Sequence, residues 1–205
     1  MIVIDHFIKS FSEYFVKLSN SHPWDITNNL SNDLFSSITQ LDAQFYINDG
    51  VAIHKSAKIE KGAILKAPII VSEDCFIGAN AYLRGGVYLG KNTSIGPSCE
   101  IKSSILCNNT QIAHLNFIGD SIIGSNVNFE AGSITANYFN ERTEKTIYVL
   151  LDSNIINTNR TKFGSLVGDH CKIGANAVLS PGTILSPNTI VKRLELIDQL
   201  KKTIN

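Results

Sequence analysis

Apolar side chains recur at every sixth position over a long stretch of the chain. From residue 53, consecutive positions in this frame are all aliphatic: Ile53, Ile59, Leu65, Val71, Ile77, Leu83, Leu89, Ile95 and Ile101. The frame continues with irregular steps at Ile112, Ile118, Ile123 and Phe129, and it is regular again at Val167, Ile173, Leu179, Leu185 and Val191. A period of six fits neither an amphipathic helix nor a simple strand, whose periods are about 3.6 and about 2 residues.

A six-residue period fits short strands separated by tight turns, with three strands forming one triangular coil. The aliphatic side chain of each strand points into the prism, and a small residue relieves crowding at the corner that follows. Glycine often stands there: Gly78, Gly90, Gly96, Gly168 and Gly174. Because stacked coils pair their strands in parallel, the pattern predicts an all-β protein. Six-residue repeats form left-handed helices as a class, an exception to the usual right-handed crossover. We therefore expect a left-handed parallel β-helix over residues 46–193.

The first 45 residues lack the repeat and are predicted to be helical. Apolar residues recur there at helical spacing, at Phe7, Phe11, Tyr14, Phe15 and Leu18. A break at Pro23 precedes a second predicted helix from Ile26 to Leu41. We expect this N-terminal helical segment, residues 1–45, to cap the prism, because an open end would expose apolar interior and strand edges.

Two other segments depart from the repeat. Residues 139–161 are polar at both ends with an apolar centre, TIYVLL, and we expect a loop or small hairpin ejected from the prism. Such insertions usually lie on the binding face of a solenoid, although a tolerated surface bulge is the alternative. Residues 194–200 alternate charged and apolar side chains, and we expect residues 194–205 to form a C-terminal helical tail that caps the other end.

Composition narrows the classes of function. The 205 residues carry no net formal charge, and their basic side chains are scattered, so we expect neither nucleic acid nor a membrane as a partner. No apolar run reaches the roughly 18 residues of a spanning helix, and the N-terminus does not resemble a signal peptide. We expect a cytoplasmic protein. Its cysteines (Cys75, Cys99, Cys107 and Cys171) have no C-x-x-C spacing, which favours buried, reduced thiols over disulfides or a zinc site.

Polar residues that could support chemistry gather between residues 112 and 139, next to the predicted insertion. They are His114, Asn116, Asn128 and Asn137. A residue at a corner of the prism cannot lie inside it, so the side chain of His114 should project outward. A lone histidine is more often structural than catalytic, and its neighbours are what make it a candidate base.

This stretch resembles the acetyltransferase half of the bifunctional glucosamine-1-phosphate acetyltransferase/uridyltransferases and, even more, the C-terminal half of the archaeal-type sugar-1-phosphate nucleotidylyltransferases. The similar motifs are PWDI (23–26), AYLRGG (81–86), IGPSCEIKSSIL (95–106), HLNFIGDSIIGSNVNFEAGSITANY (114–138) and KFGSLVGDHCKIGANAVLSPGT (162–183). No Gly-rich nucleotide loop followed by Arg is present. The resemblance therefore implies an acetyltransferase without nucleotidylyltransferase activity, which a separate protein of the same pathway would supply.

The resemblance also implies roles for individual residues. His114 would be the general base that takes a proton from the attacking amine, and its unperturbed pKa of roughly 6.5 suits that task. Arg84 and Lys102 would hold the sugar phosphate, and Lys162 would reach across to the substrate from the start of the resumed repeat. Glu100 would orient His114 or the amine, and Asn128 would bind the sugar. Ala131, Asn137, Tyr138 and Ala175 would contact acetyl-CoA.

Two positions depart from the family pattern. Phe117 stands where the bacterial family has a tyrosine, which removes a phenol hydrogen bond from the substrate site. Glu130 stands where a glycine is usual, and its carboxylate could obstruct or repel the acyl donor or simply point to solvent.

Under the resemblance, the reaction needs neither a metal nor a covalent intermediate. The amine attacks the thioester directly, and backbone N–H groups near Ala131 stabilise the oxyanion. The resemblance also implies a homotrimer, because sites of this class lie between adjacent prisms.

Two rival interpretations stay open. A γ-type carbonic anhydrase shares the predicted fold but binds zinc through three histidines, and His54, His114 and His170 lie far apart along this helix axis. The second rival interpretation is a non-catalytic trimeric module that binds a nucleotide sugar or a sugar phosphate. Phe117 and Glu130 favour it.

Overall fold

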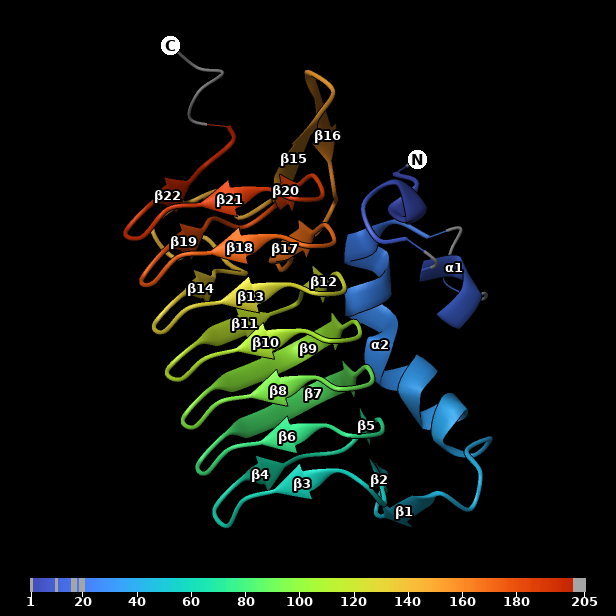
Figure 1. Cartoon of the computed structure of the whole chain (residues 1–205). Coiled ribbons are helices and arrows are strands. Elements are labelled where there is room, and N and C mark those ends of the chain that lie inside the picture. The colour runs from blue at the N-terminus through green and yellow to red at the C-terminus, as the bar shows by residue number, and fades with distance from the viewer. Residues whose placement is uncertain (1, 10, 16–17, 19–20, 201–205) are drawn as a thin grey trace.

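The computed structural model describes residues 2–9, 11–15, 18 and 21–200, and it confirms the predicted left-handed parallel β-helix (Figure 1). One coil consists of three short strands, and equivalent strands of successive coils pair in parallel to form three faces. Face 1 is a seven-stranded sheet. Its strands are β3 (Lys58–Ile59), β6 (Phe76–Ile77), β8 (Ser94–Ile95), β10 (Gln111–Ile112), β13 (Asn128–Phe129), β18 (Lys172–Ile173) and β21 (Ile190–Val191).

Faces 2 and 3 share two long strands that bend around the corner between them, β7 (Tyr82–Leu89) and β9 (Glu100–Leu106). Face 2 holds the first halves of these strands with β4 (Ile64–Leu65), β11 (Phe117–Gly119), β14 (Ile134–Thr135), β19 (Val178–Leu179) and β22 (Leu196–Ile197). Face 3 holds their second halves with β2 (Val51–His54), β5 (Ile69–Val71), β12 (Ile122–Ile123), β17 (Ser165–Val167) and β20 (Thr183–Leu185).

The residues of the six-residue frame form the interior of the prism. From Val71 to Val191 every member of the frame is buried, and all belong to one continuous core. Burial of such a side chain stabilises the fold by about 1.5–3 kcal/mol. The predicted crowding after the frame position is also present. A β-carbon on Gly96 would lie 2.7 Å from the Ala113 carbonyl carbon and 2.9 Å from the His114 nitrogen, so only glycine lets these coils approach.

The N-terminal helices cover face 3 along its length and do not cap an end, which corrects our expectation. They comprise a 3-10 helix, η1 (Ile4–His6), a short α1 (Phe11–Tyr14) and the long α2 (Pro23–Ile38), which runs beside β5, β7 and β9 (Figure 1). The outward residues of face 3 are apolar and belong to one cluster with these helices and with the inserted segment after Phe139: Ala52, Ile70, Tyr88, Ile105, Ile122, Leu166 and Ile184. Face 3 is thus buried on both sides. Residues 10, 16 and 17 of the predicted first helix lie outside the described residues.

The two ends of the prism also differ from expectation. At the N-terminal end, β1 (Phe45–Asn48) pairs antiparallel with β2. At the other end, Leu194–Leu200 forms no helix: it continues the last coil through β22, which pairs in parallel with β19. The alternation of charged and apolar residues there is that of a strand and its turns. Residues 201–205 of the predicted tail lie outside the described residues.

The insertion is a β-hairpin of β15 (Tyr148–Leu151) and β16 (Asn154–Asn157), and it extends beyond the last coils (Figure 1). It packs beside β20 on face 3, with Ile147 and Val149 fully buried. Arg160 Nη2 forms an ion pair with Asp25 Oδ1 at 2.7 Å, so the hairpin is also tied to α2. Because the helices and the hairpin cover face 3, a binding site would have to lie on face 1, on face 2 or at the corner between them. Within the described residues, no helix is both long enough and apolar enough to cross a bilayer.

Candidate functional site

Face 2 carries two ion pairs on neighbouring coils. Arg84 and Lys102 are register partners in adjacent strands, so their side chains lie on the same outer row of the sheet. Arg84 Nη2 lies 2.6 Å from Glu100 Oε1, and both side chains are about one-third exposed, at 37% and 34%. The resemblance implies that Glu100 orients His114 or the amine. In the structure its carboxylate holds the Arg84 guanidinium.

The second pair is far less exposed and includes a residue that the sequence analysis did not select. Lys102 Nζ lies 2.6 Å from Asp120 Oδ2, and the two side chains are only 15% and 9% exposed. Asn137 donates its side-chain amide to the same carboxylate oxygen. Asp120 therefore joins two predicted site residues, one expected to bind phosphate and one expected to contact acetyl-CoA. Asp120 follows Gly119, the register partner of Lys102, so this pairing became visible only with the register of the coils.

Phe117 lies over this cluster. A β-carbon on Gly119 would be 2.7 Å from Phe117 Cζ and 2.8 Å from Asn137 Nδ2, so the ring and the amide meet above the glycine. The small residue lets the aromatic ring lie along the strand beside the Lys102–Asp120 pair. The Phe117 ring thus supplies an apolar surface at the position where the similar bacterial enzymes have a tyrosine.

His114 projects from the corner between faces 1 and 2, as expected. The residue is exposed, and its ring has no hydrogen-bond partner within the described part of the chain. Its backbone is held firmly: the His114 carbonyl accepts hydrogen bonds from the Gly132 N–H and from the Asn116 amide, both at 3.1 Å. Asn116 is only 2% exposed. A rigid backbone therefore presents a free imidazole to solvent.

Asn128 lies on face 1, where its register partner in the preceding coil is Gln111. His114 follows Gln111 by three residues and precedes Phe117 by three residues, a chain distance of at most about 10 Å in either direction. The imidazole thus stands on a ridge between Asn128 on one face and Phe117 on the other.

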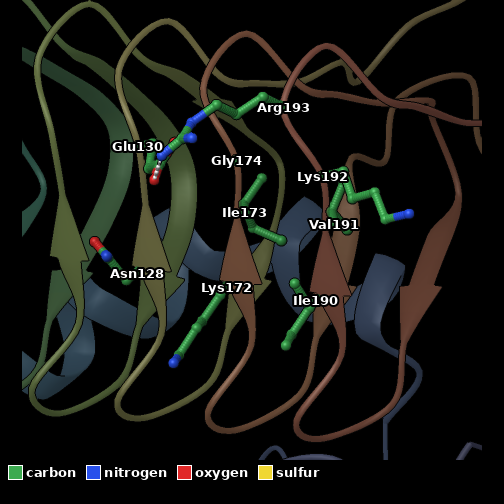
Figure 2. A pocket seen from close by; sticks show the side chains of 9 residues that line it. All are labelled: Asn128, Glu130, Lys172, Ile173, Gly174, Ile190, Val191, Lys192 and Arg193. Carbon is green, nitrogen blue, oxygen red and sulfur yellow. Dashed lines mark hydrogen bonds and ion pairs between the residues drawn. The ribbon is translucent and has the colours of Figure 1, made fainter.

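A groove of about 480 Å³ runs along face 1 beside Asn128, toward the C-terminal coils (Figure 2). Lys172, Ile190 and Lys192 line it. Glu130 closes one side, where its carboxylate accepts hydrogen bonds from Ala175 N at 2.9 Å and from Arg193 Nε and Nη2 at 2.8 Å each. These bonds, that of Arg193 first, hold the pKa of Glu130 below its usual value.

Ala131 and Ala175 lie on the same corner as His114, one and two coils further on. The Ala131 carbonyl accepts the Asn176 N–H, which fixes the two turns relative to each other. The Ala175 N–H is engaged by Glu130, as described above. Tyr138 and Lys162 lie elsewhere, on either side of the hairpin at the corner between faces 2 and 3. Both are exposed, and Lys145 Nζ lies 4.9 Å from the centroid of the Tyr138 ring.

The predicted site residues are therefore distributed over adjoining surfaces and do not line one cleft of a single chain. Face 2 brings together Arg84, Glu100, Lys102 and Phe117, with Asn137 beside them. Face 1 and its corner hold His114, Asn128, Ala131 and Ala175. Asp120 and Arg193 are the partners that sequence reasoning missed, because their contacts join residues 18 and 63 positions apart.

The described residues contain no group of three or more His, Cys, Asp or Glu side chains that could hold a metal ion. His54, His114 and His170, the ligands that a carbonic anhydrase would need, lie in three different coils, and His54 is engaged by Ser56.

The fold and the repeat define a hexapeptide-repeat β-helix protein. Residues 67–148 match the profile of the GMPPB C-terminal domain, and residues 166–192 match that of the hexapeptide repeat of succinyl-transferase. These matches confirm the resemblance expected from the motifs: the chain is similar to hexapeptide-repeat proteins and to the C-terminal domain of GMPPB.

Among curated proteins, the chain is 34% identical to the bifunctional protein GlmU of Methanocaldococcus jannaschii, over 96% of its own length and 50% of that protein. It is 30% identical to the bifunctional sugar-1-phosphate nucleotidylyltransferase/acetyltransferase of Sulfurisphaera tokodaii, over 87% and 45% of the respective lengths. The chain thus spans about half the length of these relatives.

Among solved structures, a perosamine N-acetyltransferase from Caulobacter crescentus in complex with CoA and GDP-perosamine is 13% identical, with a TM-score of 0.34. That similarity covers 68% of this chain and 49% of the other, and at this level it has no bearing on function.

Proposed function

We propose that this chain is an acetyl-CoA-dependent N-acetyltransferase that acts on an amino sugar phosphate, such as glucosamine-1-phosphate or galactosamine-1-phosphate. One observation carries the proposal. A free, exposed His114 imidazole stands on a rigid corner that adjoins face 2, and face 2 carries the register-paired cations Arg84 and Lys102. The curated relatives, which bear acetyltransferase or GlmU names, support the same chemistry over nearly the whole chain.

The reaction follows from the groups present. The amine nitrogen of the sugar attacks the thioester carbonyl carbon, a C–N bond forms, and the C–S bond breaks. His114 accepts the proton that the amine loses and returns it to the departing thiolate, which leaves as CoA. Backbone N–H groups at the corner near Ala131 stabilise the oxyanion of the tetrahedral intermediate. No metal is required.

The two ion pairs of face 2 give the acceptor subsite its character. Arg84 and Lys102 donate to the sugar phosphate through charge-assisted hydrogen bonds, while Glu100 and Asp120 hold these cations in place. Phe117 packs against the sugar ring in place of the tyrosine hydroxyl of similar enzymes. Asn128 binds a sugar hydroxyl, and Lys162 reaches the acceptor from the hairpin root.

A thiol-release assay tests the proposal. The chain should release CoA from acetyl-CoA in the presence of glucosamine-1-phosphate or galactosamine-1-phosphate. The His114→Ala variant should lose about 10²–10⁴-fold in kcat, the usual contribution of a general base. Because His114 is exposed, its replacement should leave the thermal unfolding temperature unchanged.

His170→Ala is the matched control, since His170 is another exposed corner histidine, on a different corner, and its replacement should leave kcat unchanged. If no amino sugar phosphate supports CoA release, or if His114→Ala turns over as fast as the parent chain, the proposal is wrong.

A non-catalytic module that binds a sugar phosphate is the second candidate. The observation that favours it is that both cations of face 2 are already paired with carboxylates of the same chain, and that Glu130 engages the Ala175 N–H. Calorimetric binding of glucosamine-1-phosphate without any thiol release would support this alternative.

A further inference from the structure

Glu130 is the residue on the His114 corner whose contacts the proposed reaction does not use. It follows the inward-pointing Phe129 of face 1 and stands one coil before Ala175 and two coils before Arg193. Figure 2 shows the Arg193 side chain reaching back along the groove to the Glu130 carboxylate. We call this ion pair, Glu130 with Arg193, the strap.

Part of this arrangement is a feature of the repeat. Glu60 occupies the same position in an earlier coil, and its Oε2 accepts a hydrogen bond from Ala79 N at 2.7 Å, just as Glu130 accepts one from Ala175 N. A carboxylate at this position therefore satisfies a corner N–H of the next coil. Within the described residues no arginine pairs with Glu60, so the strap is what distinguishes Glu130.

The strap lies at the surface. The Arg193 side chain is 73% exposed and that of Glu130 is 38% exposed. Exposed ion pairs contribute little to stability, so the fold does not depend on this one. The strap nevertheless has a definite geometry, because both carboxylate oxygens accept from the guanidinium and one also accepts from a backbone N–H.

The strap also covers close-packed backbone. Glu130 and Arg193 meet across Gly174, where a β-carbon would lie only 2.5 Å from Arg193 N. The Ala131 and Ala175 corner is thus closed by a charged side-chain pair on the side of the groove, and the Ala175 N–H is not free for another acceptor.

We infer that Glu130 controls the affinity for the acyl donor: its carboxylate competes with the donor for the Ala175 N–H and for Arg193. This inference rests on the proposed function, because it takes acetyl-CoA as the ligand of this corner. An anionic donor must displace the carboxylate before it can accept a hydrogen bond from Ala175. Glu130 thus lowers the affinity for the donor without contacting the acceptor.

Titration calorimetry with acetyl-CoA tests the inference through binding alone. Glu130→Ala removes the competing carboxylate and frees both donors, so acetyl-CoA should bind about tenfold more tightly. Arg193→Ala leaves the carboxylate on Ala175 without its counter-charge, so binding should become weaker than in the parent chain. Opposite effects from the two halves of one ion pair are expected of competition and not of a merely structural contact.

Glu60→Ala is the matched control, because it removes the equivalent carboxylate-to-backbone hydrogen bond away from the strap and should leave the affinity unchanged. Glu130→Gln keeps the shape and one acceptor oxygen but removes the charge, so it should lie between the parent and Glu130→Ala. Thermal unfolding of all variants should match the parent.

The inference is overturned if Glu130→Ala binds acetyl-CoA no more tightly than the parent, or if no variant binds it. The thiol-release assay tests the proposed function separately. If Glu130→Ala binds acetyl-CoA more tightly but transfers no acetyl group to any amino sugar phosphate, the inference about Glu130 holds and the proposed acetyltransferase function is wrong.

Discussion

At the scale of single residues, burial decides the chemistry of the four cysteines. Cys75, Cys99, Cys107 and Cys171 are all buried and unpaired. Burial raises the pKa of the Cys75 thiol to about 11 and also raises that of the other three. The nucleophilic species is the thiolate, so these side chains act as small apolar groups and not as reactive ones.

The native protein should therefore react very slowly with a thiol reagent such as 5,5′-dithiobis(2-nitrobenzoate) at pH 8, well below the raised pKa values. All four thiols should react at once after denaturation, when their pKa values return to about 8.5. Raising the pH should speed the reaction of the folded protein only as pH approaches the raised values. A rapid reaction of any thiol at pH 8 would contradict this account.

Also at the residue scale, charged partners determine what a side chain can do. The motifs predicted Lys102 and Arg84 as phosphate-binding cations, and those positions do share one row of face 2. Their carboxylate partners Glu100 and Asp120 were not predicted in that role, because the pairs join neighbouring coils. The residue types were readable in the sequence, whereas their pairings needed the register of the coils.

At the scale of elements, the three faces differ in what covers them. Face 3 strands such as Ile69–Val71 are apolar at every position, since alternate residues face the prism interior and helix α2. The frame of six marks only the inward residue, so it did not reveal this second apolar surface. That is why the N-terminal helices were expected at an end of the prism and lie on its side.

The packing of α2 on face 3 can be tested at its centre. Leu30 is fully buried and lies beside Gly86, where a β-carbon would be 3.4 Å from the Leu30 carbonyl carbon. Leu30→Ala should lower the free energy of unfolding by about 2–5 kcal/mol, because it leaves a cavity between the helix and the sheet.

Chemical denaturation measures this change. Asn29→Ala, at an exposed position of the same helix, is the control and should stay within about 0.5 kcal/mol of the parent. An equally small effect of Leu30→Ala would mean that α2 does not contribute to stability through face 3.

At the scale of the whole molecule, the uncovered faces carry apolar side chains. Ile134 and Leu196 lie on the outer row of face 2 with Phe117, and they are 38% and 56% exposed. Leu115 and Leu194 project from the corner between faces 1 and 2, at 63% and 79% exposure. Exposed apolar patches can mark interaction sites. These side chains would be covered in the homotrimer that the resemblance implies, in which adjoining prisms would enclose the dispersed site residues.

Light scattering coupled to size-exclusion chromatography should accordingly give the mass of a trimer. Replacing both Ile134 and Leu196 by Glu should shift the protein toward the monomer, since it would place charges in the apolar contact. Ile155→Glu, at an exposed apolar position of the hairpin on the other side of the prism, should leave the trimer intact. A monomeric parent chain would contradict the homotrimer that the resemblance implies.

The sequence by itself determined the prism, because an inward side chain at every sixth position and a crowded corner after it are local requirements that each coil repeats. It also determined which residue types surround His114. Only the tertiary structure decided that face 3 is covered and that Glu130 meets Arg193. These outcomes depend on contacts between coils and between the prism and its helices, whose distances no local period encodes.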